Sequence, residues 1–449
     1  MAGPRVRQQE ENSGMALSGP ASMTLDTNLR DRTISKLNRR IVLFAFICFI
    51  VNYLDRVNIG FAALHMNEDI GLTPYIFGIG AGIFFVGYLA FEIPSNMMLH
   101  RFGPRVWIAR IMVTWGLVSC GMAFVQGPTS FYIMRFLLGV AEAGFAPGIL
   151  LYLTYWFPAR ERGRATATFM TATVLSIVFG APLSSWLIDA GEGLWGLRGW
   201  QAMFILEGVP AAILGIVAFF YLVDSPEKDR HWLAPDERKW LIAQLEAERR
   251  AAPQDTRHDL AEIFRDWRVW LLTIVYMFNG IAVYGVIMWL PQIVKSLGNL
   301  TTLQTGFVSA IPFIFAGAGL VLVSRSSDRT GERKFHTAMG GLVGGIFLAA
   351  SAMAGSPLMG LVLLCICAFF LWSYMGVFWT LPPQFLQGAA AAGGIAAING
   401  FAQIGGFTGP YIVGYVKSAT DSFQLSLLAL AIFPVLGSLL CMTLKAKRD

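Results

Sequence analysis

The chain has 449 residues, of which 55% are hydrophobic and only 14% are charged, and its mean hydropathy is +0.57. A water-soluble domain of this length does not need so much apolar surface, and apolar runs of about 20 residues, long enough to cross a bilayer, recur along the whole sequence. The formal net charge of +6 does not indicate nucleic-acid binding, because the basic residues lie in the polar segments between these runs. The composition therefore predicts an all-α, polytopic membrane protein.

The apolar runs predict two six-helix bundles joined by a polar linker. Residues 1–37 are polar, lack the apolar core of a signal peptide, and are expected to form a disordered cytoplasmic tail. The bundles are expected at 38–223 and 268–444, the linker at 224–267 and a short cytoplasmic tail at 445–449. The twelve predicted transmembrane helices are 38–63, 77–99, 105–125, 129–157, 164–189, 200–223, 268–291, 303–324, 336–354, 357–381, 387–415 and 422–444.

The linker contains the stretch "APDERKWLIAQLEAERR", which begins with proline and acidic residues and then places Trp240, Leu241 and Leu245 at helical spacing. This pattern predicts a short amphipathic helix at the membrane surface. A simply solvated connector is the alternative.

Lysine and arginine residues are distributed very unevenly between the two sides of the predicted bundles. Of the 34 in the chain, 29 lie on the side that carries both termini and the linker, and three (Arg198, Lys295 and Lys417) lie on the opposite side. Positively charged loops stay in the cytoplasm of bacterial inner-membrane proteins. Both termini and the linker are therefore expected to be cytoplasmic.

The two halves of the sequence resemble each other at an offset of 228 residues, at which "HRFGPR" from His100 to Arg105 aligns with "DRTGER" from Asp328 to Arg333. An offset of six spans preserves the direction of each helix, so the repeat is parallel and its axis runs along the membrane normal. Parallel repeats with a site between them at mid-membrane are typical of secondary transporters.

Both aligned loops lie on the cytoplasmic side and are rich in arginine. Their side chains can bond exposed carbonyl groups at helix ends and can form ion pairs that break when the halves rock. We therefore predict a gating role for Arg101, Arg105, Asp328, Arg329 and Arg333. The alternative is that these residues only establish the orientation in the membrane.

Two full charges, Asp55 and Arg56, lie inside the first predicted span. The apolar run that precedes them begins at Ile41 and contains only 14 residues, which is too short to cross about 30 Å of hydrocarbon. Asp55 is expected about 21 Å along the helix from Ile41, a little beyond the midplane.

The fourth predicted span carries Arg135 and Glu142, which are two helical turns apart on one face. Glu142 is expected about 22 Å from the cytoplasmic end of this span, at nearly the depth of Asp55. A charge at the bilayer centre costs about 2.5–3.5 kcal/mol, so two opposite pairs in a wet cavity are more favourable than four separate charges. A static structural ion pair is the alternative.

Two other acids in the spans, Glu92 and Glu207, are interpreted as helix-packing or gating residues.

The paired charges suggest a chemistry. The planar guanidinium of Arg56 or Arg135 can bind a carboxylate in a bidentate manner. When Asp55 and Glu142 are ionised they are expected to pair with the arginines, and when they are protonated an arginine becomes free for an anion. Proton and anion would then bind with positive coupling, which is symport.

Several motifs carry a family resemblance: "NYLDRVNIGFA" in the first span, "FEIPSN" in the second, "RFLLGVAEAGFAPG" in the fourth, "YWFPARERGRA" after it and "GWQAMFILEG" in the sixth. Together with the repeated basic loop they resemble the major facilitator superfamily and, within it, the anion:cation symporter family of bacterial tartrate, hydroxyphenylacetate, phthalate and sugar-acid permeases. One departure is His100, where the superfamily usually has aspartate, so the N-terminal loop is expected to form a weaker latch than the C-terminal one.

The resemblance implies that the first and fourth spans are neighbours lining a central cavity, with Asp55 and Glu142 as coupling residues and Arg56 and Arg135 as binding residues. It also places Tyr53, Tyr88, Trp379 and Asn399 among the cavity-lining residues of sugar-acid carriers. Ordinary helix packing is the alternative for each of these four. The interior of the C-terminal spans contains no acidic or basic residue, so this half is expected to contact the rest of the substrate through polar and aromatic side chains.

The expected function is proton-coupled import of a small organic anion, such as a hydroxy-, aromatic or sugar acid, across a bacterial cytoplasmic membrane, by a monomer without cofactor or metal. An organic-anion exchanger and a Na⁺-coupled carrier remain alternatives. A drug/proton antiporter is less favoured, because "FGAPL" from Phe179 to Leu183 only loosely resembles the antiporter pattern. The sequence contains no P-loop, metal-ligand cluster or nucleophile–base set, and an enzyme is not expected.

Overall fold

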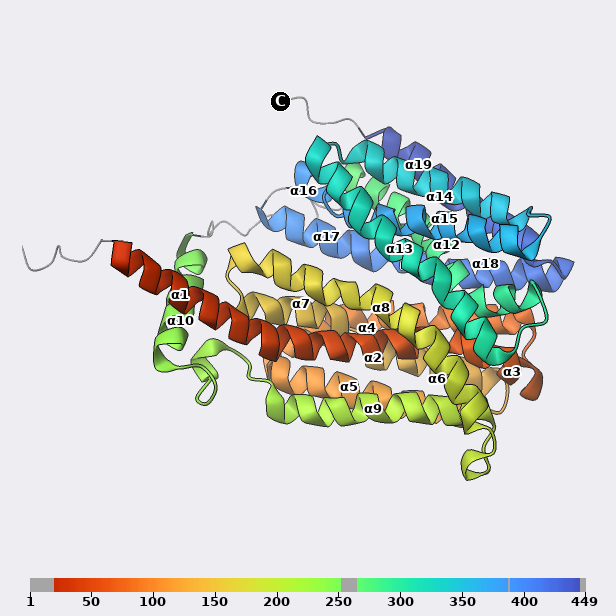
Figure 1. Cartoon of the computed structure of the whole chain (residues 1–449), viewed down its shortest axis with the longest axis horizontal. Helices are drawn as coiled ribbons and strands as arrows, with labels where there is room; N and C mark the ends of the chain where they lie inside the picture. The colour runs from red at the N-terminus through yellow and green to blue at the C-terminus, as the bar shows by residue number, and fades with distance from the viewer. Residues whose placement is uncertain (1–19, 252–264, 387, 445–449) are drawn as a thin grey trace, which may run out of the picture.

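The computed structural model describes residues 20–251, 265–386 and 388–444, with the backbone alone for 20–27 and 388–392. All the regular elements in these residues are helices (Figure 1). Those before the linker are α1 (Pro20–Leu37), η1 (Asn38–Val42), α2 (Leu43–Val57), α3 (Ile59–Asp69), α4 (Pro74–Phe102), α5 (Pro104–Gly121), η2 (Met122–Phe124), α6 (Pro128–Glu142), α7 (Phe145–Trp156), α8 (Ala159–Gly191), η3 (Leu194–Gly196) and α9 (Gly199–Tyr221). The remainder are η4 (Pro226–Lys228), α10 (Pro235–Ala251), α12 (Trp267–Ser296), α13 (Thr302–Thr330), α14 (Lys334–Ala352), α15 (Pro357–Phe378), α16 (Pro382–Phe385), α17 (Gly388–Ala402), α18 (Ile404–Thr420) and α19 (Phe423–Met442).

Within the described residues, eleven helical segments are long and apolar enough to cross a membrane. They coincide with eleven of the twelve predicted spans. The other prediction, 387–415, corresponds to α17 and α18, which are separated at Gln403. The all-α, polytopic architecture is thus confirmed, and several spans are built from two shorter helices rather than from one.

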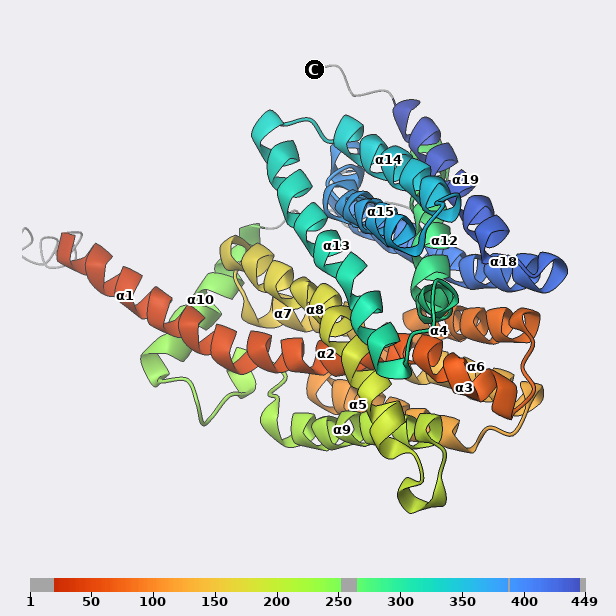
Figure 2. The same cartoon turned by 45° about the vertical axis from the view of Figure 1, so that its right-hand side comes forward.

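The two halves of the molecule meet mainly at one end of the bundle. We call the end that carries α10 the linker end, and the opposite end the far end (Figures 1 and 2). At the far end α4 packs on α18 and α8 packs on α13. The glycines there allow backbones to touch: a Cβ on Gly414 would lie 2.5 Å from the carbonyl oxygen of Pro74, and one on Gly306 would lie 2.7 Å from that of Ala181. The far end is therefore tightly closed between the halves.

The linker end is organised by ion pairs that tie α1 to α10 and α8. Lys36 Nζ lies 2.8 Å from Glu237 Oε2, and Arg32 Nε lies 2.7 Å from Glu237 Oε1. Arg30 pairs with Glu161 at the start of α8. Glu237 is completely buried, so its two cationic partners compensate for the loss of hydration.

Part of the segment expected to be disordered, residues 20–37, is instead the helix α1. The reason is tertiary: the partners of its basic residues lie between 131 and about 205 positions further along the chain, so the local sequence gives no signal of them. Helix α10 lies where an amphipathic helix was predicted in the linker, and it buries Leu241 and Leu245. Residues 1–19, 252–264 and 445–449 lie outside the described residues, so the expectations for them stay predictions.

A substitution at the far end tests the tightness of the contact between the halves. Gly414→Ala places a methyl group against the Pro74 carbonyl, so we expect the halves to separate at this end. Spin labels at cysteines introduced for Gly127 and Gly355, in a background without native cysteines, should show a shift toward longer distances by electron paramagnetic resonance. The control is Gly280→Ala, where the nearest atom to a new Cβ is 3.9 Å away. An unchanged distance distribution in Gly414→Ala would contradict the closed far end.

A second test concerns the buried carboxylate of α10. Burial raises the pKa of Glu237, but hydrogen bonds from Lys36 and the Ala234 N–H and the positive charges of Lys36 and Arg32 outweigh it, so its pKa lies below the usual value. The ion pair is therefore complete above about pH 4.3, the usual glutamate pKa, and is lost as the pH falls through the lowered value. A double-mutant cycle of Glu237→Gln with Lys36→Gln should give a coupling of about 1 kcal/mol at pH 7, measured by hydrogen exchange in α10. The exposed pair of Glu246 with Arg250 is the control, and an equally small coupling at both sites would disprove the role of Glu237.

Candidate functional site

A buried ion pair joins the first and fourth spans near the middle of the bundle. Arg56 on α2 donates through Nη2 to Oε1 of Glu142, the last residue of α6. Arg56 is 8% exposed and Glu142 is fully buried. Among the described residues, the second carboxylate oxygen of Glu142 and the Nε of Arg56 have no hydrogen-bond partner. The pair is thus a single-point contact, which leaves part of the guanidinium fork unused.

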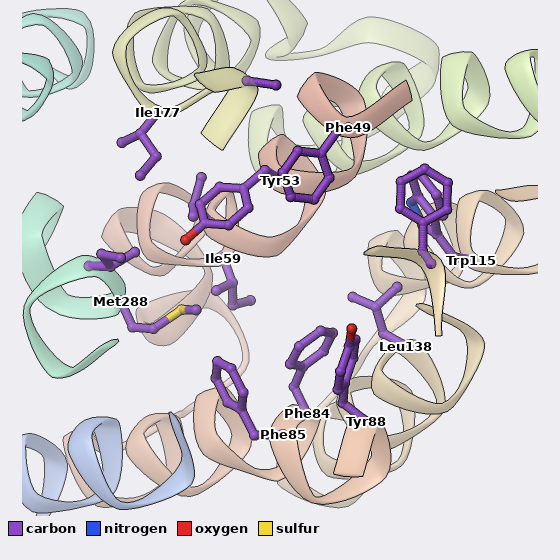
Figure 3. Packing of buried hydrophobic residues seen from close by; sticks show 14 of the residues in the cluster. Phe49, Tyr53, Ile59, Phe84, Phe85, Tyr88, Trp115, Leu138, Ile177 and Met288 are labelled. Carbon is purple, nitrogen blue, oxygen red and sulfur yellow. The ribbon is translucent and has the colours of Figure 1, made fainter. Parts of the chain in front are cut away.

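Aromatic side chains surround the guanidinium of Arg56. Its Cζ lies 5.6 Å from the ring centroid of Tyr53, 5.3 Å from that of Phe84 and 5.2 Å from that of Tyr88. In Figure 3, Phe84 and Tyr88 lie side by side on α4, across a common space from Tyr53 on α2. Cation–π attraction at such distances stabilises a desolvated arginine by about 2 kcal/mol or more. The structure therefore brings together Arg56, Tyr53 and Tyr88 as the sequence predicted.

The C-terminal half contributes Tyr284 of α12 to the surroundings of Arg56, close enough for an electrostatic interaction with the guanidinium. The Tyr284 ring also lies 4.5 Å from that of Phe85. The arginine thus contacts both halves of the molecule. The sequence predicts polar and aromatic contacts from this half without singling out Tyr284, because no local pattern distinguishes it from the others.

Glu142 lies at a break in the fourth span. Ala143 is extended and Gly144 adopts a left-handed conformation, with φ of 87°, before α7 begins at Phe145. A Cβ on Gly144 would lie 2.4 Å from Ser95 Oγ. The sequence predicted one continuous helix here, over 129–157. Gly139 serves close approach, because its Cβ would meet the Phe84 carbonyl, whereas Gly144 interrupts the helix.

This break gives a test by thermal unfolding of the purified protein. Gly144→Ala forces a left-handed conformation on a residue with a Cβ and also crowds Ser95, so we expect a loss of roughly 1–2 kcal/mol or more. Gly163→Ala is the matched control: Gly163 lies in α8 with no atom near a new Cβ, and alanine there should stabilise by about 0.5–1 kcal/mol. Equal effects of the two substitutions would show that the break is not required.

Arg135 does not form the ion pair that the sequence predicted. It is fully buried on α6, where Nε and Nη2 each lie 3.3 Å from a backbone carbonyl, those of Gly80 and Ala81 respectively. Its Cζ is 5.0 Å from the ring of Phe84, the same ring that Arg56 contacts. Both bonds are long for N–H···O contacts. Arg135 therefore shares an aromatic neighbour with Arg56 but has no carboxylate partner in the described residues.

Asp55 also differs from the expectation, because it points away from both arginines. Its Oδ2 accepts a hydrogen bond from Trp115 Nε1 at 2.7 Å, and its Oδ1 accepts from Ser119 Oγ at 2.9 Å and from Asn58 Nδ2 at 3.4 Å. Consecutive residues on a helix are rotated by about 100°, so Asp55 and Arg56 face different neighbours. The predicted meeting of four charges is wrong in this respect: one opposite pair forms, and Asp55 is held by neutral donors.

The two remaining residues predicted to line the cavity lie on the C-terminal half. Asn399 Nδ2 of α17 donates to Glu92 Oε1 of α4 at 3.3 Å, which is a polar contact between the halves. Trp379, just beyond α15, packs its ring 4.9 Å from that of Tyr276. Sequence reasoning left Glu92 out of the site, although an acid within an apolar span was a usable signal.

The predicted gating loops are held within their own halves. In the N-terminal half, Arg105 donates through its backbone N–H to Asp224 Oδ1 at 3.0 Å and through Nε to the Phe219 carbonyl at 2.6 Å. Gly103, with φ of 87°, lies so close to Asp224 that a Cβ would meet its carboxylate at 2.6 Å. Asp224, at the start of the linker, thus supplies the acid that position 100 lacks.

In the C-terminal half the loop between α13 and α14 closes on itself. Arg333 Nη1 pairs with Asp328 Oδ1 at 2.5 Å and also contacts Ser327 Oγ at 3.2 Å. Arg101 and Arg329 are exposed. The gating roles of these residues remain predictions.

The sequence and fold match known transporters. A family model described as Major Facilitator Superfamily matches residues 45–410. A putative tartrate transporter from Agrobacterium vitis is 49% identical over 399 residues, which cover 89% of this chain and 91% of that protein. A quinolone resistance transporter from Acinetobacter baumannii is 40% identical over 403 residues, covering 90% and 92%. A crystal structure of a bacterial homolog of the human lysosomal transporter Spinster has a TM-score of 0.74 at 16% identity, covering 89% of this chain and 95% of that one.

Proposed function

This chain belongs to the Major Facilitator Superfamily, and from that membership we propose that it imports a small organic anion together with a proton. It is a multi-pass membrane transporter rather than an enzyme. The observation that carries the finer proposal is the buried, single-point contact of Arg56 with Glu142. The identity to a putative tartrate transporter supports a hydroxy acid as the substrate class.

Arg56 is the proposed anion-binding residue. While Glu142 is ionised, it neutralises Arg56, and an incoming anion meets a carboxylate of like charge. When Glu142 takes up a proton, its charge disappears and Arg56 becomes an uncompensated cation in an apolar site. A substrate carboxylate can then accept two parallel hydrogen bonds from the guanidinium. Each ligand thereby favours the binding of the other, which is the thermodynamic requirement for symport.

The remaining predicted residues have supporting roles in this proposal. The hydroxyl groups of Tyr53, Tyr88 and Tyr284 can bond the oxygens of a hydroxy acid, and Trp379 and Asn399 lie on the opposite half. Arg135 and Asp55 belong to the same N-terminal bundle, Arg135 as a second cation beside Phe84 and Asp55 as a buried acid that takes part in proton binding. No metal or organic cofactor has a part in this scheme.

The charge bias of the loops supports an orientation with the linker end in the cytoplasm of a bacterial inner membrane. In that orientation the far end faces outward, and the closed contact between the halves there corresponds to an inward-facing state. Import then requires α4 and α18, and α8 and α13, to separate while the linker end closes. The monomer contains both halves of such a site.

Uptake into proteoliposomes tests this function. With an acidic exterior, the wild type should concentrate labelled tartrate or a related acid from a panel. Glu142→Gln should abolish concentration driven by the pH gradient while retaining counterflow, because the neutral amide mimics the protonated acid. Arg56→Lys should raise KM by about tenfold, the equivalent of 1.4 kcal/mol, because a point charge replaces the planar fork.

Glu246→Gln removes an exposed carboxylate on α10 and serves as the control, with unchanged uptake. If Glu142→Gln still concentrates the anion under a pH gradient, the coupling role is wrong. Dependence on internal anion would indicate an exchanger, and dependence on a sodium gradient would indicate a Na⁺-coupled carrier.

Drug efflux is a second candidate function, favoured by the 40% identity to a quinolone resistance transporter. The same vesicles distinguish it. An antiporter would move a fluoroquinolone in the direction opposite to the flow of protons and would show no tartrate uptake. The proposed importer would leave the drug distribution unchanged.

A further inference from the structure

A second group of buried carboxylates lies inside the N-terminal bundle, away from Arg56. Glu207 of α9 accepts a hydrogen bond at Oε1 from Ser184 Oγ of α8 and another at Oε2 from Asn58 Nδ2, both at 2.7 Å. The same Nδ2 lies 3.4 Å from Asp55 Oδ1. Asp55, Asn58 and Glu207 are 1%, 0% and 4% exposed. One amide group thus bridges two acids on helices α2 and α9, and all three groups are removed from solvent.

The surroundings of this pair supply no positive charge. The helices packed on α9 present Asp55 from α2, Asn58 at the start of α3, the thiol of Cys120 from α5 and Ser184 from α8. Neither acid forms an ion pair with a lysine, arginine or histidine in the described part of the chain, since Arg56 is engaged by Glu142. The other charged residues on these helices lie toward their ends; those nearest the far end are His65, Glu68, Asp69 and Asp189, with Arg198 just before α9. Two further titratable residues, Cys48 and Tyr53, lie within α2.

Two neighbouring ionised carboxylates without a cation are strongly unfavourable in a low-dielectric interior. The usual solution is that such a pair retains one proton, as two close acids cannot both ionise. Asp55 accepts three hydrogen bonds and is the better-stabilised anion. Glu207 accepts two and is the acid that retains the proton.

The side-chain amide of Asn58 has one buried atom, Oδ1, without a hydrogen-bond donor in the described residues. In the orientation shown, its Nδ2 donates to both carboxylates, which suits two acceptors. An asparagine amide can be turned over without changing its shape. In the turned orientation Oδ1 would accept the O–H of a protonated Glu207, and Nδ2 would give up its bonds to Glu207 and Asp55. The amide can therefore respond to whether the proton is present.

The helices that hold this group also form a pocket at the far end. It has a volume of about 520 Å³, and its lining includes His65 and Asp69 of α3, Asp189 of α8, Glu192 just after α8, Arg198 just before α9 and Trp200 of α9. Asn58 and Glu207 lie seven residues inward from His65 and Trp200, which corresponds to about 10 Å along each helix. The lining residues of the pocket belong to the N-terminal half, and one of them, His65, also lies with its Nε2 3.0 Å from Thr302 Oγ1 of α13 in the C-terminal half.

Building on the proposed function, we propose that Glu207 and Asp55, bridged by Asn58, form a second proton-binding site that holds one proton and is distinct from Glu142. The proton adds to a carboxylate oxygen from water on the outer side and leaves to water on the cytoplasmic side; no other bond forms or breaks. In this scheme Glu207 is a proton-binding residue of the transport cycle, and Asn58 is a positioning residue.

Glu207→Gln separates this role from a purely structural one. Glutamine keeps the size and the hydrogen bonds of a protonated glutamate, so a structural Glu207 would tolerate it and the variant would concentrate the anion like the wild type. A proton-binding Glu207 would not: concentration driven by the pH gradient should fall at least tenfold while counterflow continues, and the pH dependence of counterflow should flatten. Glu207→Asp should restore part of the accumulation, and Glu246→Gln is again the control.

A second measurement applies even if Glu207→Gln does not transport. In pH-difference infrared spectra of the purified protein, the wild type should show the carbonyl band of a protonated carboxylic acid in an apolar site, and Glu207→Gln should lose or shift it. Asn58→Leu should shift the same band. Retention of an unchanged band in Glu207→Gln, or full pH-driven accumulation by that variant, would overturn the proposal. If the wild type itself shows no pH-driven uptake, the proposed function fails, whereas the infrared band tests the proton site directly.

Discussion

The cost of placing a charge in the membrane interior governs the arrangement of this molecule. Arg56 can remain at mid-bundle because a carboxylate and three aromatic rings replace its hydration shell, with Tyr284 close by. Each of these partners comes from a different position along α2, α4, α6 and α12. The helices must therefore pack closely enough to reach one guanidinium, and the glycines of α4 and α6 make this approach possible: a Cβ on Gly139 would collide with the Phe84 carbonyl.

The two halves divide the work unequally. The N-terminal half holds the buried ionisable groups, and the C-terminal half contributes tyrosines, a tryptophan and an asparagine at the contact between them. Tyr284 reaches Arg56, and Asn399 reaches Glu92. Any rocking of the halves changes these two contacts, while the Arg56–Glu142 pair moves as one unit within its own bundle. The Arg56–Glu142 ion pair thus stays within one bundle, and the contacts that would change between the halves are individual polar contacts of Tyr284 and Asn399.

The sequence predicts the spans, the parallel repeat and the residues of the central ion pair, because apolar run length and an isolated charge within such a run are local signals. It does not predict the helix α1, whose basic residues depend on Glu237 and Glu161 far along the chain. The break after Glu142 was missed because a glycine that permits close packing and one that ends a helix look alike in sequence. The direction of Asp55 was missed for a related reason. The position of a charged residue along an apolar run gives its depth in the membrane, but which side chains lie opposite each face of the helix depends on tertiary packing.

Asp55 and Arg56 are adjacent in the sequence, yet they point from different sides of α2 toward different neighbours. Asp55 faces α5 through Trp115 and Ser119, whereas Arg56 faces α4 and α6. A change in the charge of Asp55 alters its attraction to these two donors, and the helix that carries it also carries the guanidinium. The chain stays helical through Asn58, whose φ and ψ are −57° and −26°, so a shift of this stretch carries Asp55 and Arg56 together. One helix in this way links the hydrogen bonds of Asp55 inside the N-terminal bundle to the surroundings of Arg56 between the halves.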